Sequence, residues 1–168
     1  MNTKLTIRRI GSTELPLLEN FLYHAIFVPH GAPPFPRDEI YKPHCYIYID
    51  GFGSKPGDYG VVAESEGKPV GAAWVRVIPA FGHIDNKTPE LAISVLSEYR
   101  NQQIGAILMT RLFEILSENG YMQTSLAVQK ENPAVRFYQR LGYNIVRETD
   151  EEYIMLKILH DEKTQIKY

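Results

Sequence analysis

The chain has 168 residues, of which 44% are hydrophobic and 23% charged, and its formal net charge is −2. This composition is typical of one globular domain that is long enough to bury a core. The weak charge argues against a nucleic acid or an anionic membrane as partner, and no apolar stretch approaches the ~18 residues that span a bilayer. The single cysteine, Cys45, allows no internal disulfide. We therefore expect a reducing, cytoplasmic compartment.

The first half of the chain predicts a strand, a helix, an irregular insert and a β-hairpin. Residues 4–10 alternate in polarity, and apolar residues then recur at helical spacing between residues 15 and 26. Five of the eleven prolines lie between Pro29 and Pro43, so we expect only short helical turns in an insert at residues 28–58. Strands are predicted at residues 59–66 and 69–79, with Trp74 in the core.

The second half predicts strands and helices in alternation. The expected strands lie at residues 90–96, 124–129, 143–147 and 153–159. A helix at residues 104–119 ends at Gly120, and a second helix begins with Asn132 as its N-cap and ends at Leu141-Gly142. The pattern predicts one α/β domain over residues 1–160, with a polar tail at 161–168. Its single mixed, mostly antiparallel sheet has about six or seven strands, and helices cover both faces.

The polar loop that precedes the helix at residue 104 is the first candidate binding site. A strand leads directly into this helix, and a helix N-terminus carries N–H groups without partners, which favour an anion. The chain has neither GxxxxGK[ST] nor GxGxxG, which excludes the two best-known nucleotide loops. The loop therefore predicts a diphosphate site, and an ordinary helix start is the alternative.

Two segments resemble the signatures of the GNAT superfamily of acetyl-CoA-dependent N-acetyltransferases. YRNQQIGA, residues 99–106, resembles the family's pyrophosphate loop, Arg/Gln-x-x-Gly-x-Gly/Ala, except that Gln103 replaces the first glycine. A non-glycine residue there can still donate its N–H if its φ is negative, so we expect altered contacts with phosphate. AVQKENPAVRFYQRLGY, residues 127–143, resembles the second family signature. The matching residues are Asn132, Phe137, Tyr138, Gly142 and Tyr143.

The resemblance implies that acetyl-CoA is the cosubstrate, with its pantetheine arm inserted between strands 90–96 and 124–129. It implies that Asn132 holds this arm and that a backbone N–H at a bulge near Val95 supports the thioester oxygen. The loop residues implied to hold the diphosphate are Arg100, Asn101, Gln102, Gln103, Ile104, Gly105 and Ala106. A solvated surface arginine is the alternative for Arg100.

Two residues are candidates for proton transfer. Helical spacing places Tyr138 at the margin of a stripe that faces the sheet, and the resemblance implies that it protonates the departing CoA thiolate. A core-edge tyrosine with a satisfied hydroxyl is the alternative.

Glu90 opens a strand where many family members carry a catalytic glutamate, so we expect it to act as general base through water. An exposed strand-end carboxylate is the alternative reading, and Glu98 and Asp85 are weaker rivals.

These features predict an N-acetyltransferase that acts on a primary amine of a small molecule or peptide, by direct attack in a ternary complex. A non-catalytic CoA-binding sensor or interaction module on the same fold is the alternative.

The insert's aromatics and acids could form a pocket for a cationic amine or could pack its short helices; the acids are Asp38, Glu39, Asp50 and Asp58. The five histidines lack metal-ligand spacing, so no metal is expected. The resemblance also suggests a homodimer.

Overall fold

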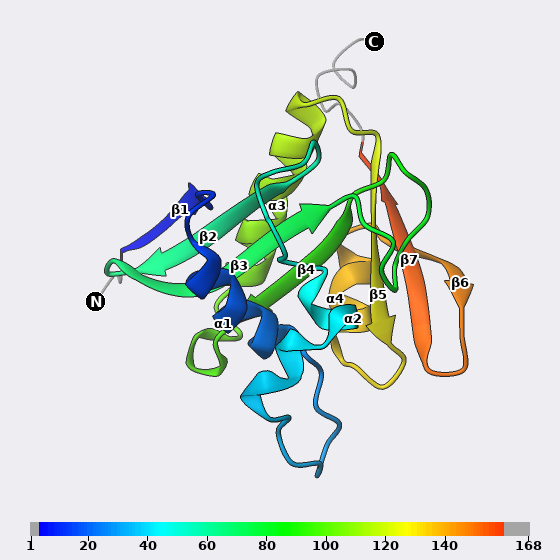
Figure 1. Ribbon diagram of the computed structural model, residues 1–168, viewed down its shortest axis with the longest axis horizontal. Helices are drawn as coiled ribbons and strands as arrows, with labels where there is room; N and C mark the ends of the chain where they lie inside the picture. Colours follow the sequence, from blue (N-terminus) through cyan, green and yellow to red (C-terminus); the bar gives the residue numbers. More distant parts are fainter. Residues whose placement is uncertain (1–3, 160–168) are drawn as a thin grey trace.

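Seven strands form one mixed sheet in the computed structural model, which describes residues 4–159. The strand order is β1-β2-β3-β4-β5-β7-β6 (Figure 1). The strands are β1 (Leu5–Arg9), β2 (Tyr59–Ser65), β3 (Lys68–Arg76), β4 (Glu90–Val95), β5 (Gln123–Gln129), β6 (Asn144–Glu148) and β7 (Glu152–Ile158). Neighbouring strands are antiparallel except β4 and β5, which are parallel. The predicted fold class is confirmed.

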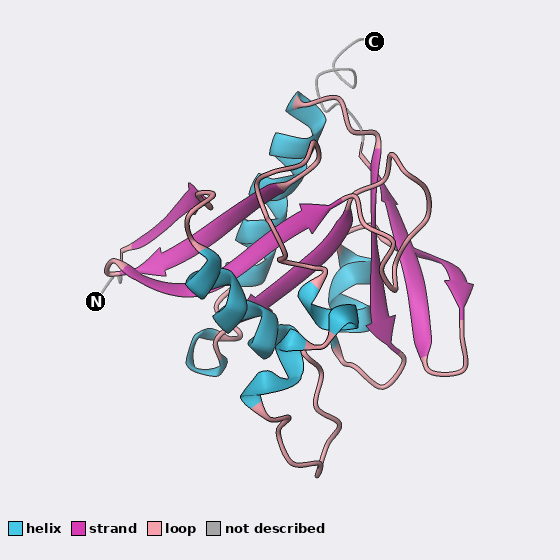
Figure 2. Ribbon diagram, in the orientation of Figure 1, coloured by secondary structure: helices cyan, strands magenta, loops and turns pink. Residues whose placement is uncertain are grey.

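Helices cover both faces of this sheet (Figure 2). They are α1 (Leu15–Ala25), α2 (Pro43–Tyr46), α3 (Ile104–Glu118) and α4 (Ala134–Arg140), with 3-10 turns η1 (Arg37–Tyr41) and η2 (Ser97–Tyr99). Figure 1 draws α1 and α2 in front of the sheet and α3 behind it. No helix between residues 4 and 159 combines the length and apolar character needed to cross a bilayer.

The local signals in the sequence fix most element boundaries to within a few residues. Glu66 and Gly67 both have positive φ (52° and 80°), as the tight turn of the β2–β3 hairpin requires. At the start of α4, Asn132 Oδ1 accepts a hydrogen bond from the Ala134 N–H at 2.9 Å, which confirms its capping role. The insert at residues 28–58 forms only η1 and α2, as its prolines predict. The tail at 161–168 lies outside the described residues.

Each face of the sheet has its own hydrophobic core because side chains alternate along the strands. The helix α3 is buried against one face along an apolar stripe, with Leu108, Leu112 and Ile115 at 0% exposure. On the other face, α1 and the insert pack around Trp74, which is also fully buried. The tryptophan is therefore a core residue, as predicted.

The parallel contact between β4 and β5 is brief. The two strands pair at a single register position, Glu90 opposite Ser125. Beyond that pair, β3 is the only strand with which β4 pairs, whereas β5 pairs along its whole length with β7. The sheet consequently opens between β4 and β5, and this opening positions the candidate site.

Candidate active site

A cavity of about 1210 Å³ lies over the opening between β4 and β5. Its walls come from the end of α1 and the loop that follows, from β4, from the 99–106 loop and from α4. Most of the residues selected from the sequence line it: Val95, Arg100, Asn101, Gln103, Ile104, Gly105, Ala106, Asn132 and Tyr138. Gln102 and Glu90 do not. The volume exceeds that of a typical drug-sized pocket and suits a long ligand.

The loop before α3 presents backbone N–H groups that the protein itself does not use. Among the described residues, no acceptor receives a hydrogen bond from the N–H groups of residues 101–106, and the first bond in the helix is donated by Ile107 to Gln103. Asn101 and Gln103 are both left-handed, with φ of 61° and 64°. Such alternation of backbone conformation gathers neighbouring amides into a concave anion-binding site.

Gln103 and Gly105, which occupy the two glycine positions of the family motif, have different structural roles here. Gln103 has a positive φ, so the negative φ assumed for a non-glycine residue at this position is wrong, while its altered contact with phosphate stays a prediction. Its backbone instead takes the conformation that glycine adopts freely. Gly105 has no unusual φ, but a Cβ there would lie 3.2 Å from the ring of Phe137. Gly105 therefore lets α4 pack closely against the start of α3.

Replacing Gln103 with glycine is expected to raise the free energy of unfolding by up to about 1 kcal/mol, because a left-handed conformation strains a residue with a Cβ. Urea denaturation measures this change. Gln102→Gly is the matched control, since Gln102 has no positive φ, and it should instead lose about 0.5–1 kcal/mol. If both variants lose stability equally, the backbone at Gln103 is not strained.

Arg100 reaches back from the loop to the end of β4. Its Nε donates to the Val95 carbonyl at 3.2 Å, and its terminal nitrogens make no bond to described residues. On the other edge of β4, the Leu96 N–H donates to Val70 on β3. Because backbone groups alternate along a strand, the N–H of Val95 points into the opening. The expected bulge is wrong: β3 and β4 stay in continuous register to Val95.

Tyr138 lines the cavity and carries a protonated phenol. Its ring contacts those of Phe137 and Tyr143, with centroids 5.5 and 5.9 Å away. The hydroxyl makes no hydrogen bond within residues 4–159, which contradicts the alternative of a satisfied core-edge tyrosine. Loss of solvent raises the pKa of this phenol to about 12, so it carries its proton at neutral pH and can act as an acid.

Glu90 lies at the closed end of the opening and is only 1% exposed. The alternative of an exposed carboxylate is therefore wrong. Its Oε2 accepts hydrogen bonds from the Tyr48 hydroxyl and from the Gly82 N–H, the latter at 2.9 Å. Burial raises the pKa of the carboxyl above its ordinary value. Of its rivals, Asp85 closes a turn by accepting bonds from Lys87 and Thr88.

Two of the four acids in the insert form ion pairs. Asp58 forms a buried ion pair with Arg76 at 3.0 Å, and Glu39 pairs with Lys42 at 2.7 Å. Of the residues considered for an acceptor pocket, only Phe35 lines the cavity. These contacts favour the alternative in which the aromatics and acids of the insert pack and pair within the fold.

A family model described as the acetyltransferase (GNAT) family matches residues 22–143. The chain belongs to this family. It is 35% identical over 86 residues to an uncharacterized Bacillus subtilis protein, YyaT, and the match covers 51% of this chain and 52% of that relative. The match thus spans about half the length of the curated relative.

Solved GNAT structures share the fold over nearly the whole chain. The PaiA N-acetyltransferase of Thermoplasma acidophilum, in complex with coenzyme A, has a TM-score of 0.69 at 18% identity and covers 92% of this chain and 99% of its own. The putative acetyltransferase YncA of Salmonella typhimurium, with acetyl-CoA, has a TM-score of 0.66 at 17% identity and covers 95% and 96%.

Sequence reasoning missed two parts of this GNAT site. The end of α1 and the following loop contribute residues 23–28 to the cavity, and Tyr48 contacts Glu90. The α1 residues carry no motif, and Tyr48 is one of several aromatics in the insert, so neither had a signal of its own.

Within residues 4–159, no three His, Cys, Asp or Glu side chains gather as metal ligands; His160 lies outside them.

Proposed function

We propose that this GNAT protein transfers the acetyl group of acetyl-CoA to a primary amine by direct attack in a ternary complex. The observation that carries the proposal is the row of backbone N–H groups at residues 101–106, which have no acceptor among the described residues and belong to a loop that, apart from Gln102, lines the cavity. Diphosphate is the part of acetyl-CoA that such a helix start would bind. A family relative bound to coenzyme A supports the same choice of ligand.

Each residue around the cavity has a proposed task in holding acetyl-CoA, which supplies an activated acetyl thioester. The amides of residues 101–106 and the terminal nitrogens of Arg100 bind the diphosphate. The side-chain amide of Asn132 has its oxygen engaged in capping α4, which leaves its NH₂ group to donate to the pantetheine arm. The Val95 N–H, pointing into the opening, supports the thioester oxygen as negative charge develops there.

Two proton transfers complete the proposed chemistry. Glu90 takes a proton from the acceptor ammonium, so that the free amine can attack. It lies about 10 Å along β4 from Ile93, the nearest β4 residue that lines the cavity, so water carries this proton. Tyr138 gives its own proton to the departing thiolate, a task suited to a phenol whose pKa is raised to about 12.

Two measurements on the whole chain test the proposal. Acetyl-CoA at about 100 times its Kd should stabilise the folded state by about 2.7 kcal/mol and raise Tm by about 5 °C or more. With a panel of primary amines, release of free thiol should exceed the rate of hydrolysis. A Tm that does not respond to acetyl-CoA contradicts the proposal. A shift in Tm without thiol release from any amine favours the non-catalytic sensor.

A further inference from the structure

We propose that Tyr48 is a positioning residue for Glu90: it holds Oε2, so that Oε1 is the atom that receives the acceptor's proton. The inference rests on the proposed function and adds a residue of the insert to its machinery. Tyr48 lies outside the cavity wall, so it acts through Glu90 rather than on acetyl-CoA.

The two oxygens of Glu90 have opposite surroundings. Oε2 accepts from both Tyr48 and Gly82, whereas Oε1 is buried with no hydrogen-bond partner among the described residues. A buried carboxylate oxygen without a donor is costly, and native structures rarely contain one without a reason. Because Oε2 is already occupied by two donors, an incoming proton adds to Oε1.

The Gly82 side of this arrangement is rigid. The Ser125 hydroxyl donates to the Gly82 carbonyl at 2.7 Å, which fixes the β3–β4 loop to β5. A Cβ on Gly82 would lie 2.7 Å from the Leu126 carbonyl carbon and 3.0 Å from Glu90 Cδ. Only glycine fits there, so its N–H is held against Oε2 by the surrounding backbone.

The Tyr48 side is held just as firmly by β3. The Trp74 indole N–H donates to the Tyr48 carbonyl at 2.9 Å. Arg76 donates to the carbonyls of Ile47 and Asp50, at 3.1 and 2.6 Å, while it pairs with Asp58. These bonds lock the backbone on both sides of Tyr48 to the sheet. The insert therefore delivers one hydroxyl to a fixed place.

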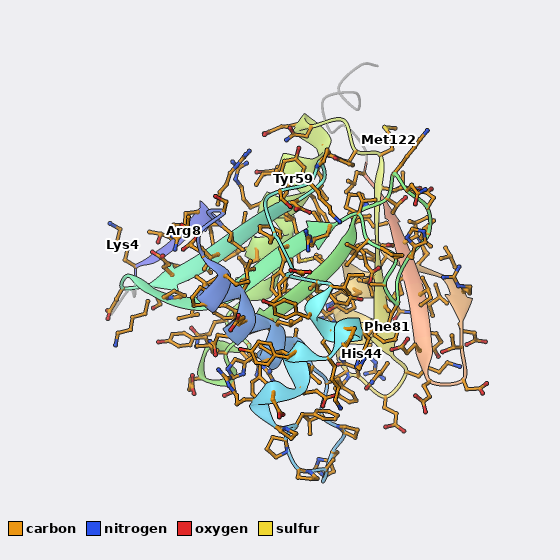
Figure 3. The ribbon with its side chains drawn as sticks, viewed as in Figure 1. Lys4, Arg8, His44, Tyr59, Phe81 and Met122 are labelled. Carbon is orange, nitrogen blue, oxygen red and sulfur yellow. The ribbon has the colours of Figure 1, made fainter. Side chains whose placement is uncertain are left out.

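Residues of α2 and of the β3–β4 loop lie close together, and several charged groups set the electrostatic surroundings of the Glu90 carboxylate. The rings of His44 on α2 and Phe81 in the β3–β4 loop touch, with centroids 5.9 Å apart (Figure 3). The titratable groups that face Glu90 are Tyr48, His83 and Glu152: the first two lower the pKa of Glu90 and the third raises it. Arg76, opposite Glu90 on β3, is engaged by Asp58.

The proton balance of the step is simple. An N–H bond of the acceptor ammonium breaks, its electron pair stays on nitrogen, and the proton adds to Oε1 through water. Tyr48 keeps its own proton, because burial beside the carboxylate raises the pKa of its phenol. Its hydroxyl stabilises the charged form of Glu90 and so keeps the base ionised at a lower pH than burial alone would allow.

The test is a titration of the Glu90 Cδ resonance in protein labelled with ¹³C at glutamate, assigned by its loss in Glu90→Gln. In wild type the midpoint should lie above the ordinary value of about 4.3. Tyr48→Phe removes a donor to the charged form and should raise the midpoint by about one to two pH units. Tyr46→Phe, which loses a hydroxyl with no bonding partner in residues 4–159, should leave it unchanged.

Turnover gives a second readout. The acidic limb of kcat/KM should move to higher pH by the same amount in Tyr48→Phe, and KM for acetyl-CoA should stay within about twofold. An unmoved resonance in Tyr48→Phe overturns the inference even if acetyl transfer is observed. A moved resonance with an unmoved acidic limb also overturns it, because Glu90 is then not the base. If no amine is acetylated, the proposed function fails. The Glu90 resonance still shows whether Tyr48 bonds to Glu90.

A substitution-free measurement covers the case in which Tyr48→Phe does not fold. Uniform replacement of tyrosine by 3-fluorotyrosine keeps every hydroxyl but makes the phenols more acidic donors. Because Tyr48 is the tyrosine that bonds to Glu90 in the described residues, the Glu90 midpoint should fall. A midpoint that stays in place or rises contradicts the inference.

Discussion

Replacing Tyr138 with phenylalanine is expected to lower kcat for acetyl transfer by about 100-fold or more, because a positioned general acid contributes at least that much. The hydroxyl has no other partner in the described chain and is protonated at neutral pH, so its loss removes the proton source and little else. KM and Kd for acetyl-CoA should change by less than about threefold, as steady-state kinetics and calorimetry would show.

Tyr99→Phe is the matched control for this prediction. Tyr99 also lines the cavity, but it belongs to the η2 turn before α3, and it has no proposed role in proton transfer. Its loss should leave kcat close to wild type. If Tyr138→Phe and Tyr99→Phe behave alike, Tyr138 is a wall residue. If kcat and affinity for acetyl-CoA fall together in Tyr138→Phe, the hydroxyl binds the cosubstrate instead of protonating it.

Replacing Asp58 with alanine is expected to lower the free energy of unfolding by about 3–5 kcal/mol, because it leaves the Arg76 guanidinium buried without its counter-charge. The two side chains are 1% and 2% exposed and share two hydrogen bonds, at 3.0 and 3.1 Å. Asp58 also accepts bonds from the N–H groups of Gly53 and Lys55. Urea unfolding of wild type and variant measures the loss.

Glu114→Ala is the control for the ion pair. Glu114 pairs with Arg111 at 3.0 Å on the exposed surface of α3, and the loss should stay within about 0.5 kcal/mol. The double variant Asp58→Leu, Arg76→Met should lose less than Asp58→Ala, since no buried charge is left unpaired. A loss in Asp58→Ala as small as in Glu114→Ala would mean that the buried pair contributes nothing to stability.

The sequence predicts those parts of the molecule in which neighbours along the chain decide the structure. The helix predicted at residues 104–119, the cap at Asn132 and the hairpin between residues 59 and 79 all rest on local signals, and each is confirmed. The loop at residues 99–106 can also be recognised from the sequence, because its polar residues separate a strand from a helix.

Contacts between distant segments carry no such signal. Tyr48 and Glu90 are 42 positions apart, and the path of the proline-rich insert between them follows no period. Asp58 could equally have faced a ligand, and only its burial beside Arg76 assigns it to the core. Gly105 matched a phosphate motif, yet its reason for being glycine is the ring of Phe137 on another helix.

The lone register pair between Glu90 and Ser125 also has a mechanical consequence. It leaves few backbone bonds across the junction between two halves of the sheet, β1 to β4 on one side and β5, β7 and β6 on the other. A molecule that bonded to both inner edges would act as a strut between the halves. Binding of such a ligand would then stiffen the whole sheet without any change in its topology.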